Sequence, residues 1–187
     1  MGTQVASYPK EWEKEIVLKN GVHVLLRPEL STDTEMLWTM FSTLSKASLE
    51  NLVLPFTRER IEGWTSNIDY DKALPIHALI REGKEQSIVG SASLRFHSAD
   101  ALKHKAELGI TIHDACQNRG LGTAMINHLL MIARKKGLKK VYLRVNIENA
   151  GAIHAYETCG FKIEARLRME RYQNGKFGDE YRMAIFL

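Results

Sequence analysis

The most constraining feature of the sequence is a polar turn with two glycines, which stands between a strand-like segment and the most regular amphipathic segment. The turn reads Gln117-Asn118-Arg119-Gly120-Leu121-Gly122. Apolar residues at helical spacing then predict a helix that ends at Gly137, namely Met125, Ile126, Leu129, Ile132 and Ala133. Glycines and the unpaired N–H groups of a helix start favour an anion such as a pyrophosphate. A tight turn without a ligand explains the same residues, so the turn alone leaves both interpretations open.

The other segments predict strands and helices that alternate along one continuous chain. Period-2 or buried apolar runs predict strands at 22–26, 76–80, 88–96, 106–112, 141–145, 161–169 and 180–186. Besides the helix after Gly122, we expect a helix capped by Ser31 or Thr32, one opened by Thr57, and a short one at 149–158. The three strands from 76 to 112 are separated only by turn-forming residues, which indicates a central antiparallel meander.

Composition points to one folded domain. The chain has 187 residues, of which 44% are hydrophobic and 26% charged, enough for a single core without disulfides. We therefore expect a single domain over 1–187, with a core at about 22–187 and an N-terminal extension at 1–21. A net charge of +4 suits an anionic ligand and is too small to indicate a nucleic-acid partner.

The location of the protein is also predicted from the sequence. Met1 to Pro9 lacks the basic and then apolar pattern of a signal peptide, and no apolar run approaches the roughly 18 residues of a membrane span. Two cysteines, Cys116 and Cys159, are too few for a disulfide framework or a metal cage. We expect a cytoplasmic protein with no membrane partner and no metal site.

A second motif lies one strand after the strong helix and reads Asn149-Ala150-Gly151-Ala152-Ile153-His154-Ala155-Tyr156-Glu157-Thr158-Cys159-Gly160-Phe161. Together, the two motifs resemble the GNAT superfamily of N-acetyltransferases, whose pattern is Q/R-x-x-G-x-G/A followed by N-x-x-A-I-x-x-Y-E-x-x-G-F. The resemblance extends to the order of elements over about 22–186. It implies an α/β (α+β) fold with a mixed, mostly antiparallel sheet of roughly six to seven strands, flanked by about four helices and splayed between the fourth and fifth strands.

The resemblance implies that acetyl-CoA is the co-substrate and lies in the splayed gap. Backbone groups of three strand residues are expected to bond the pantetheine arm and the acetyl carbonyl: Ile110, Thr111 and Ile112. The turn is expected to bind the pyrophosphate through Gln117, Asn118, Arg119, Gly120, Leu121, Gly122 and Thr123. Asn149 is expected to contact the cofactor as well.

Direct attack of an amine on a thioester needs a neutral amine, a polarised carbonyl and a proton for the sulfur. The resemblance assigns the proton donor to Tyr156. For the general base we favour Glu107, on the strand that lines the acceptor cavity, although an ion-paired strand-edge residue is an equally good interpretation. Some relatives that acetylate protein N-termini carry a glutamate five residues before the motif asparagine, where this chain has Arg144.

The acceptor is predicted only as a primary amine. A weaker resemblance to the acetyltransferase domain of microbial protein-lysine acetyltransferases rests on Tyr8-Pro9, Trp12-Glu13, Leu18-Lys19-Asn20-Gly21, Arg27-Pro28, Phe41 and Leu44-Ser45. It favours a protein lysine, and a protein N-terminal amine is a further acceptor that we consider. A small amine such as a polyamine, amino acid or drug is the alternative, to which Asp69 and Asp71 could contribute charge unless they are simply exposed turn residues. A non-catalytic acyl-CoA sensor and a homodimer also remain open.

Overall fold

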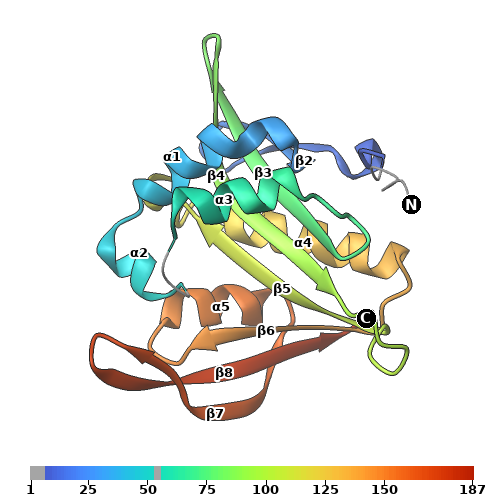
Figure 1. Ribbon diagram of the computed structural model, residues 1–187, viewed down its shortest axis with the longest axis vertical. Helices are drawn as coiled ribbons and strands as arrows, with labels where there is room; N and C mark the ends of the chain where they lie inside the picture. Colours follow the sequence, from blue (N-terminus) through green and yellow to red (C-terminus); the bar gives the residue numbers. More distant parts are fainter. Residues whose placement is uncertain (1–6, 53–55) are drawn as a thin grey trace.

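The computed structural model describes residues 7–52 and 56–187, and one mixed sheet organises them (Figure 1). Its eight strands lie in the order β1-β2-β3-β4-β5-β6-β8-β7. All neighbours are antiparallel except β5 and β6, which are parallel. The strands are β1 Lys14–Val17, β2 His23–Pro28, β3 Ala73–Glu82, β4 Glu85–Phe96, β5 Lys105–Ile112, β6 Lys140–Asn146, β7 Lys162–Gln173 and β8 Lys176–Phe186.

Helices cover both faces of this sheet, with α1 and α3 on one face and α4 on the other (Figure 1). The five α-helices of the described residues are α1 Thr34–Ser42, α2 Lys46–Glu50, α3 Arg58–Ser66, α4 Leu121–Lys135 and α5 Ala150–Thr158. The predicted class, a mixed and mostly antiparallel sheet between helices, is confirmed. The sheet has one strand more than expected because the short β1 pairs with β2. The structure also has one helix more than expected, since the five-residue α2 is too short to show a helical period in the sequence.

The predicted start of the first helix is wrong. Neither Ser31 nor Thr32 caps an α-helix, because residues Ser31–Asp33 form a 3-10 turn and α1 begins at Thr34. The carboxylate that organises this turn belongs to Asp33, which accepts a hydrogen bond from the Leu30 N–H at 2.8 Å. By contrast, Thr57 caps α3 as predicted, since its hydroxyl accepts from the Arg60 N–H at 3.3 Å.

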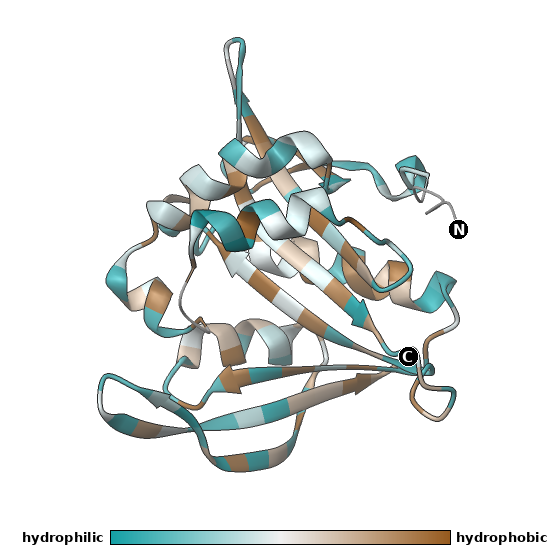
Figure 2. Ribbon diagram, viewed as in Figure 1, coloured by the Kyte–Doolittle hydropathy of each residue, from teal (hydrophilic) through white to brown (hydrophobic). Residues whose placement is uncertain are grey.

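The apolar face of α4 forms the centre of the larger core. Its predicted core residues are all buried, namely Met125, Ile126, Leu129, Ile132 and Ala133. They pack on β4 and β5 beside buried strand residues such as Leu94 and Leu108. Figure 2 shows the same division, with hydrophobic residues along the central strands and hydrophilic ones in the loops.

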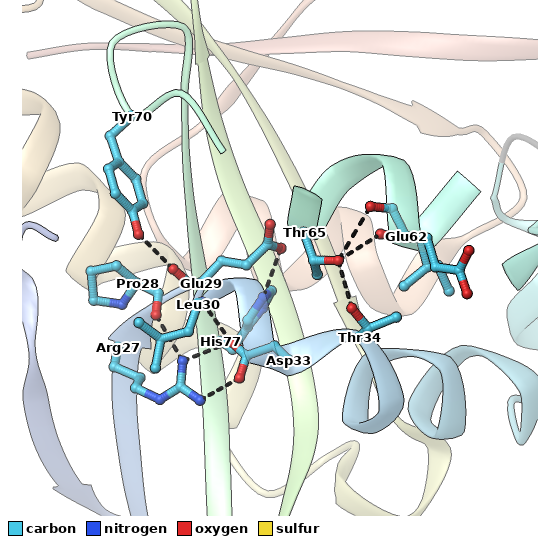
Figure 3. Close-up of polar contacts among 11 residues, drawn as sticks. Arg27, Pro28, Glu29, Leu30, Asp33, Thr34, Glu62, Thr65, Tyr70 and His77 are labelled. Atoms are coloured by element: carbon cyan, nitrogen blue, oxygen red, sulfur yellow. Dashed lines mark hydrogen bonds and ion pairs between the residues drawn. The ribbon is translucent and has the colours of Figure 1, made fainter. Parts of the chain in front are cut away.

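A smaller core holds α1 and α3 on the opposite face, beside a buried polar cluster (Figure 3). Arg27 and Asp33 form a buried, two-pronged ion pair with N–O distances of 2.7 and 2.6 Å. The Thr34 and Thr65 hydroxyls, 2.6 Å apart, join the start of α1 to the end of α3. These contacts fix the two helices over the sheet. None of the helices within 7–52 and 56–187 is both long and apolar enough to cross a membrane.

The splay predicted between the fourth and fifth strands is confirmed at β5 and β6. These strands pair only through Lys105, Ala106 and Glu107, which lie opposite Lys140, Val141 and Tyr142. Beyond Glu107, β5 stays paired with β4 and its other edge leaves β6. The sheet therefore opens into a V along residues 108–112.

Candidate active site

A cavity of about 850 Å³ occupies the V between β5 and β6. Its walls come from both strands, from α3 and α5, and from the hairpin of β7 and β8. Five of the predicted site residues line it: Glu107, Ile110, Thr111, Asn149 and Tyr156. Residues of β5 and of the second motif, which are far apart in the sequence, thus meet at one cavity.

The open edge of β5 suits an extended ligand. Ile110 and Thr111 line the cavity, whereas Ile112 at the end of the strand is not among its lining residues. Since β4 uses only one edge of β5, the backbone groups on the other edge are directed toward the gap from residue 108 on. A ligand with amide groups can add to such an edge as a strand does.

The polar turn has the backbone geometry that an anion-binding loop requires. Asn118 and Gly120 adopt left-handed conformations with φ of 58° and 83°, and Gly120 is the N-cap of α4. At the start of α4, the first N–H groups have no preceding helical turn whose carbonyls could accept their hydrogen bonds. None of residues 117–123 lines the 850 Å³ cavity, so the turn lies outside that cavity, beyond the end of β5.

Gln117 also holds the protein together at this turn. Its side-chain amide donates to the Ile112 carbonyl at 3.0 Å and to the Ser48 hydroxyl at 3.2 Å. These bonds fasten the turn to the end of β5 and to α2. The cofactor contact expected for Gln117 remains a prediction, and the side chain already has this structural function.

Tyr156 projects from α5 into the cavity and is only 7% exposed. Burial raises the pKa of its phenol to about 12, with a smaller contribution from Cys159. The phenol therefore stays protonated at neutral pH. Asn149, also on the cavity wall, caps α5 through its side-chain oxygen, which accepts from the Ala152 N–H at 3.2 Å.

Glu107 is an ion-paired residue at the closed end of the V. One carboxylate oxygen lies 3.0 Å from a guanidinium nitrogen of Arg95, and the other lies 3.5 Å from Nε of Arg144. Arg144 also pairs with Glu170 at 2.9 Å. The residue that replaces the glutamate of some relatives thus joins two acidic side chains. Burial opposes the charge of Arg144, but Glu107 and Glu170 outweigh it and raise its pKa.

Sequence reasoning missed one carboxylate that the fold brings into the cavity. Glu180 begins the predicted last strand, but in β8 it lies opposite Asn146 of β6 and is 7% exposed. Burial raises its pKa, although Arg144 and Arg171 oppose the shift. The available signal was the acidic pair Asp179-Glu180 at the start of a strand-like segment, and which of the two is buried could not be known without the pairing of β6 and β8.

An aromatic cluster lines the cavity from the side of α1 and α3. Phe41 and Phe56 stack with ring centroids 4.6 Å apart, and Trp64 meets both rings edge-on at 5.9 and 5.8 Å. The Arg60 guanidinium lies 5.0 Å from the Phe56 ring centre. Of the two loop acids, Asp69 lines the cavity and pairs with Lys72 at 2.8 Å, whereas Asp71 is not among the lining residues. This wall of the cavity therefore presents mainly apolar aromatic surface to a ligand.

Comparisons with known proteins agree with this geometry. A family model described as "Acetyltransferase (GNAT) family" matches residues 38–161. The spermidine N(1)-acetyltransferase of Vibrio cholerae serotype O1 is 33% identical over 105 residues, which are 56% of this chain and 60% of that protein. The L-amino acid N-acetyltransferase of Escherichia coli K12 is 29% identical over 98 residues, 52% of this chain and 60% of that protein. The matched stretches thus span about three fifths of these relatives.

Solved structures share the fold over nearly the whole chain. The GNAT domain of S. lividans PAT superposes with a TM-score of 0.78 and 21% identity, covering 97% of this chain and 100% of that domain. A GNAT-family acetyltransferase from Streptococcus pneumoniae gives a TM-score of 0.72 at 25% identity, covering 88% of this chain and 99% of that one. The overall fold is therefore shared with these proteins.

Proposed function

The chain belongs to the acetyltransferase (GNAT) family, and from that premise we propose that it transfers the acetyl group of acetyl-CoA to a primary amine by direct attack of the amine nitrogen. GNAT acetyltransferases use acetyl-CoA as their co-substrate. The observation that carries the proposal is the meeting of Tyr156 with the open edge of β5 in one cavity.

Residues of this chain fit the parts of acetyl-CoA in order. The open edge of β5 at Ile110, Thr111 and Ile112 supplies backbone groups for the pantetheine arm. The left-handed turn and the first N–H groups of α4, residues 117–123, supply donors for the pyrophosphate. Asn149, the first residue of the second motif, lies on the cavity wall. These assignments extend the sequence predictions and are supported by the backbone geometry.

The chemistry requires no covalent intermediate on the protein. The amine nitrogen forms a bond to the acetyl carbon, the carbon–sulfur bond breaks, and the thiolate takes the phenol proton of Tyr156. The nitrogen gives up a proton in return, which restores the tyrosine. Backbone N–H groups of β5 are suited to polarise the carbonyl oxygen. Glu107 as the base stays a prediction, and its two arginine partners compete with a proton for the carboxylate.

For the acceptor we propose a lysine side chain of a protein, as the weaker sequence resemblance implies, or else a protein N-terminal amine. The alternative is a small amine, which is supported by the enclosed aromatic wall of Phe41, Phe56 and Trp64 and by relatives named as spermidine and L-amino acid acetyltransferases. The cytoplasmic location and the homodimer remain predictions from the sequence.

Two measurements, made one after the other, test this function. Titration of CoA into the protein in a calorimeter should give saturable heat, and no heat would reject the assigned cofactor site. Release of free thiol from acetyl-CoA should then depend on an added amine or protein from a mixed panel, with labelled acetyl groups mapped to a nitrogen. CoA binding without amine-dependent thiol release by any acceptor would favour a non-catalytic acyl-CoA sensor.

A further inference from the structure

Glu180 is the most deeply buried of three neighbouring carboxylates in the cavity. Its side chain is 9% exposed, compared with 19% for Glu107 and 34% for Glu170. Its ion pair is also the longest of the three, because its carboxylate oxygen lies 3.7 Å from Nε of Arg171. Glu107 contacts Arg95 at 3.0 Å and Arg144 at 3.5 Å. The carboxylate with the weakest competing partners is therefore Glu180.

From this arrangement we infer that Glu180 is the general base that takes a proton from the incoming ammonium group, and that Arg171 positions it. The inference rests on the proposed function, since it deepens the chemistry of the same cavity. Glu180 lies opposite Asn146 on β6, on the cavity side of the strand, and shares the cavity with Tyr156. The acid and the base thus come from different elements of one site.

The reaction balances with this assignment. The ammonium group of the acceptor gives one proton to the Glu180 carboxylate and becomes a neutral amine. The amine nitrogen then bonds to the acetyl carbon, the thiolate leaves with the proton of Tyr156, and the second nitrogen proton restores that phenol. The net products are an amide, CoA thiol and one proton, which Glu180 releases to solvent.

The surroundings of Glu180 suit this task. Burial raises the pKa of its carboxyl and therefore its affinity for a proton. The charged groups that face it are Arg144 on β6, Arg171 and Glu170 on β7, and Glu107 on β5, and the two arginines oppose the effect of burial by favouring the ionised carboxylate. Arg171 is anchored independently, since its guanidinium donates to the Glu50 and Leu52 carbonyls at 2.8 and 2.9 Å. That anchor holds its contact with Glu180 in place.

The test compares Glu180→Gln with Glu107→Gln over a range of pH, using an aliphatic amine acceptor found in the panel. Without its base, the enzyme can use only amine that is already neutral, and this fraction grows about tenfold per pH unit below the amine pKa of about 10.4. We expect Glu180→Gln to lose about 10²-fold or more in kcat/KM at pH 7 and to recover toward pH 9. Glu15→Gln, an exposed carboxylate on β1, should match the wild type.

The other possible results of this experiment would contradict the assignment of Glu180 or identify a different base. A Glu180→Gln loss of the same factor at every pH indicates a structural role and overturns the assignment, as does an unchanged enzyme. A pH-dependent recovery in Glu107→Gln alone assigns the base to Glu107. CoA affinity, measured for each variant, shows whether the variant is folded. If Glu180→Gln fails to fold, Glu180→Asp replaces it in the test; because this variant retains a carboxylate, it should keep the wild-type pH dependence. An inactive wild type with every amine rejects the proposed function instead.

Discussion

The Asp114 carboxylate accepts a hydrogen bond from the Ser45 N–H at 2.8 Å and another from the Ser45 hydroxyl at 2.7 Å, although the two residues are 69 positions apart. The Ser48 hydroxyl adds a third bond at 2.6 Å. One carboxylate thus ties the start of α2, near the acceptor side of the cavity, to the loop between β5 and the polar turn.

Asp114→Asn should destabilise the protein and change its response to acid. The Ser45 and Ser48 hydrogen bonds lower the pKa of Asp114 to about 2, below its ordinary value of 3.8. A carboxyl whose pKa is lower in the folded state contributes stability above the unfolded pKa and loses it as pH falls through the folded one. In urea unfolding, the variant should be less stable by about 1–3 kcal/mol at pH 7. This gap should close between pH 4 and 2; a constant gap would contradict the carboxylate's role.

Tyr156→Phe should slow turnover and leave CoA binding nearly intact. The substitution removes a proton donor and little contact area, so kcat should fall by about 10²-fold while the calorimetric affinity changes less than about threefold. Because burial raises the phenol pKa to about 12, the wild type should show no loss of activity from this group up to about pH 10. Unchanged turnover would remove Tyr156 from the mechanism.

Gly120→Ala should weaken CoA binding because the turn needs a left-handed residue at this position. Gly120 has φ of 83°, and open space surrounds the position of a Cβ atom, so the penalty is backbone strain of about 1–2 kcal/mol. Gly21→Ala is the matched control, since Gly21 has φ of 81° and equally open surroundings in the turn before β2. Both variants should lose stability, and only Gly120→Ala should lose CoA affinity by calorimetry. Equal affinities would separate the turn from the cofactor.

Asp33→Asn should be among the most damaging changes to stability. Asp33 is fully buried and Arg27 is 8% exposed, so removal of the carboxylate leaves a buried guanidinium without its counter-ion (Figure 3). We expect a loss of about 3–5 kcal/mol in urea unfolding. Glu62→Gln removes the exposed partner of Arg58 on α3 and should cost less than about 1 kcal/mol. Similar losses for both variants would contradict the dependence on burial.

Much of the fold and part of the cavity wall could be predicted because local patterns determine them. The apolar period of α4, the Thr57 cap and the two glycine-containing motifs each depend on neighbours within a few positions in the sequence. The resemblance then placed Tyr156 and Glu107 in one gap, and both line the cavity.

The remaining features depend on partners far away in the sequence. Glu180 is buried only because β8 inserts between β6 and β7. The ion pairs of Glu107 likewise need Arg95 and Arg144, from two other strands. No local pattern specifies which charged side chains will meet, so the base could not be chosen from the sequence.

The balance of charge in the cavity predicts poor use of polyamines. Among the described residues, its wall carries five acidic and five basic side chains: Glu29, Asp69, Glu107, Glu170 and Glu180, with Arg60, Lys72, Arg95, Arg144 and Arg171. Most of the acids are already paired, so there is no excess of negative charge to attract a polycation. We expect kcat/KM for spermidine to be no higher than for a single amine flanked by apolar groups, such as a lysine in an uncharged peptide. A preference of tenfold or more for spermidine, lost at high salt, would show that the cavity attracts polycations after all.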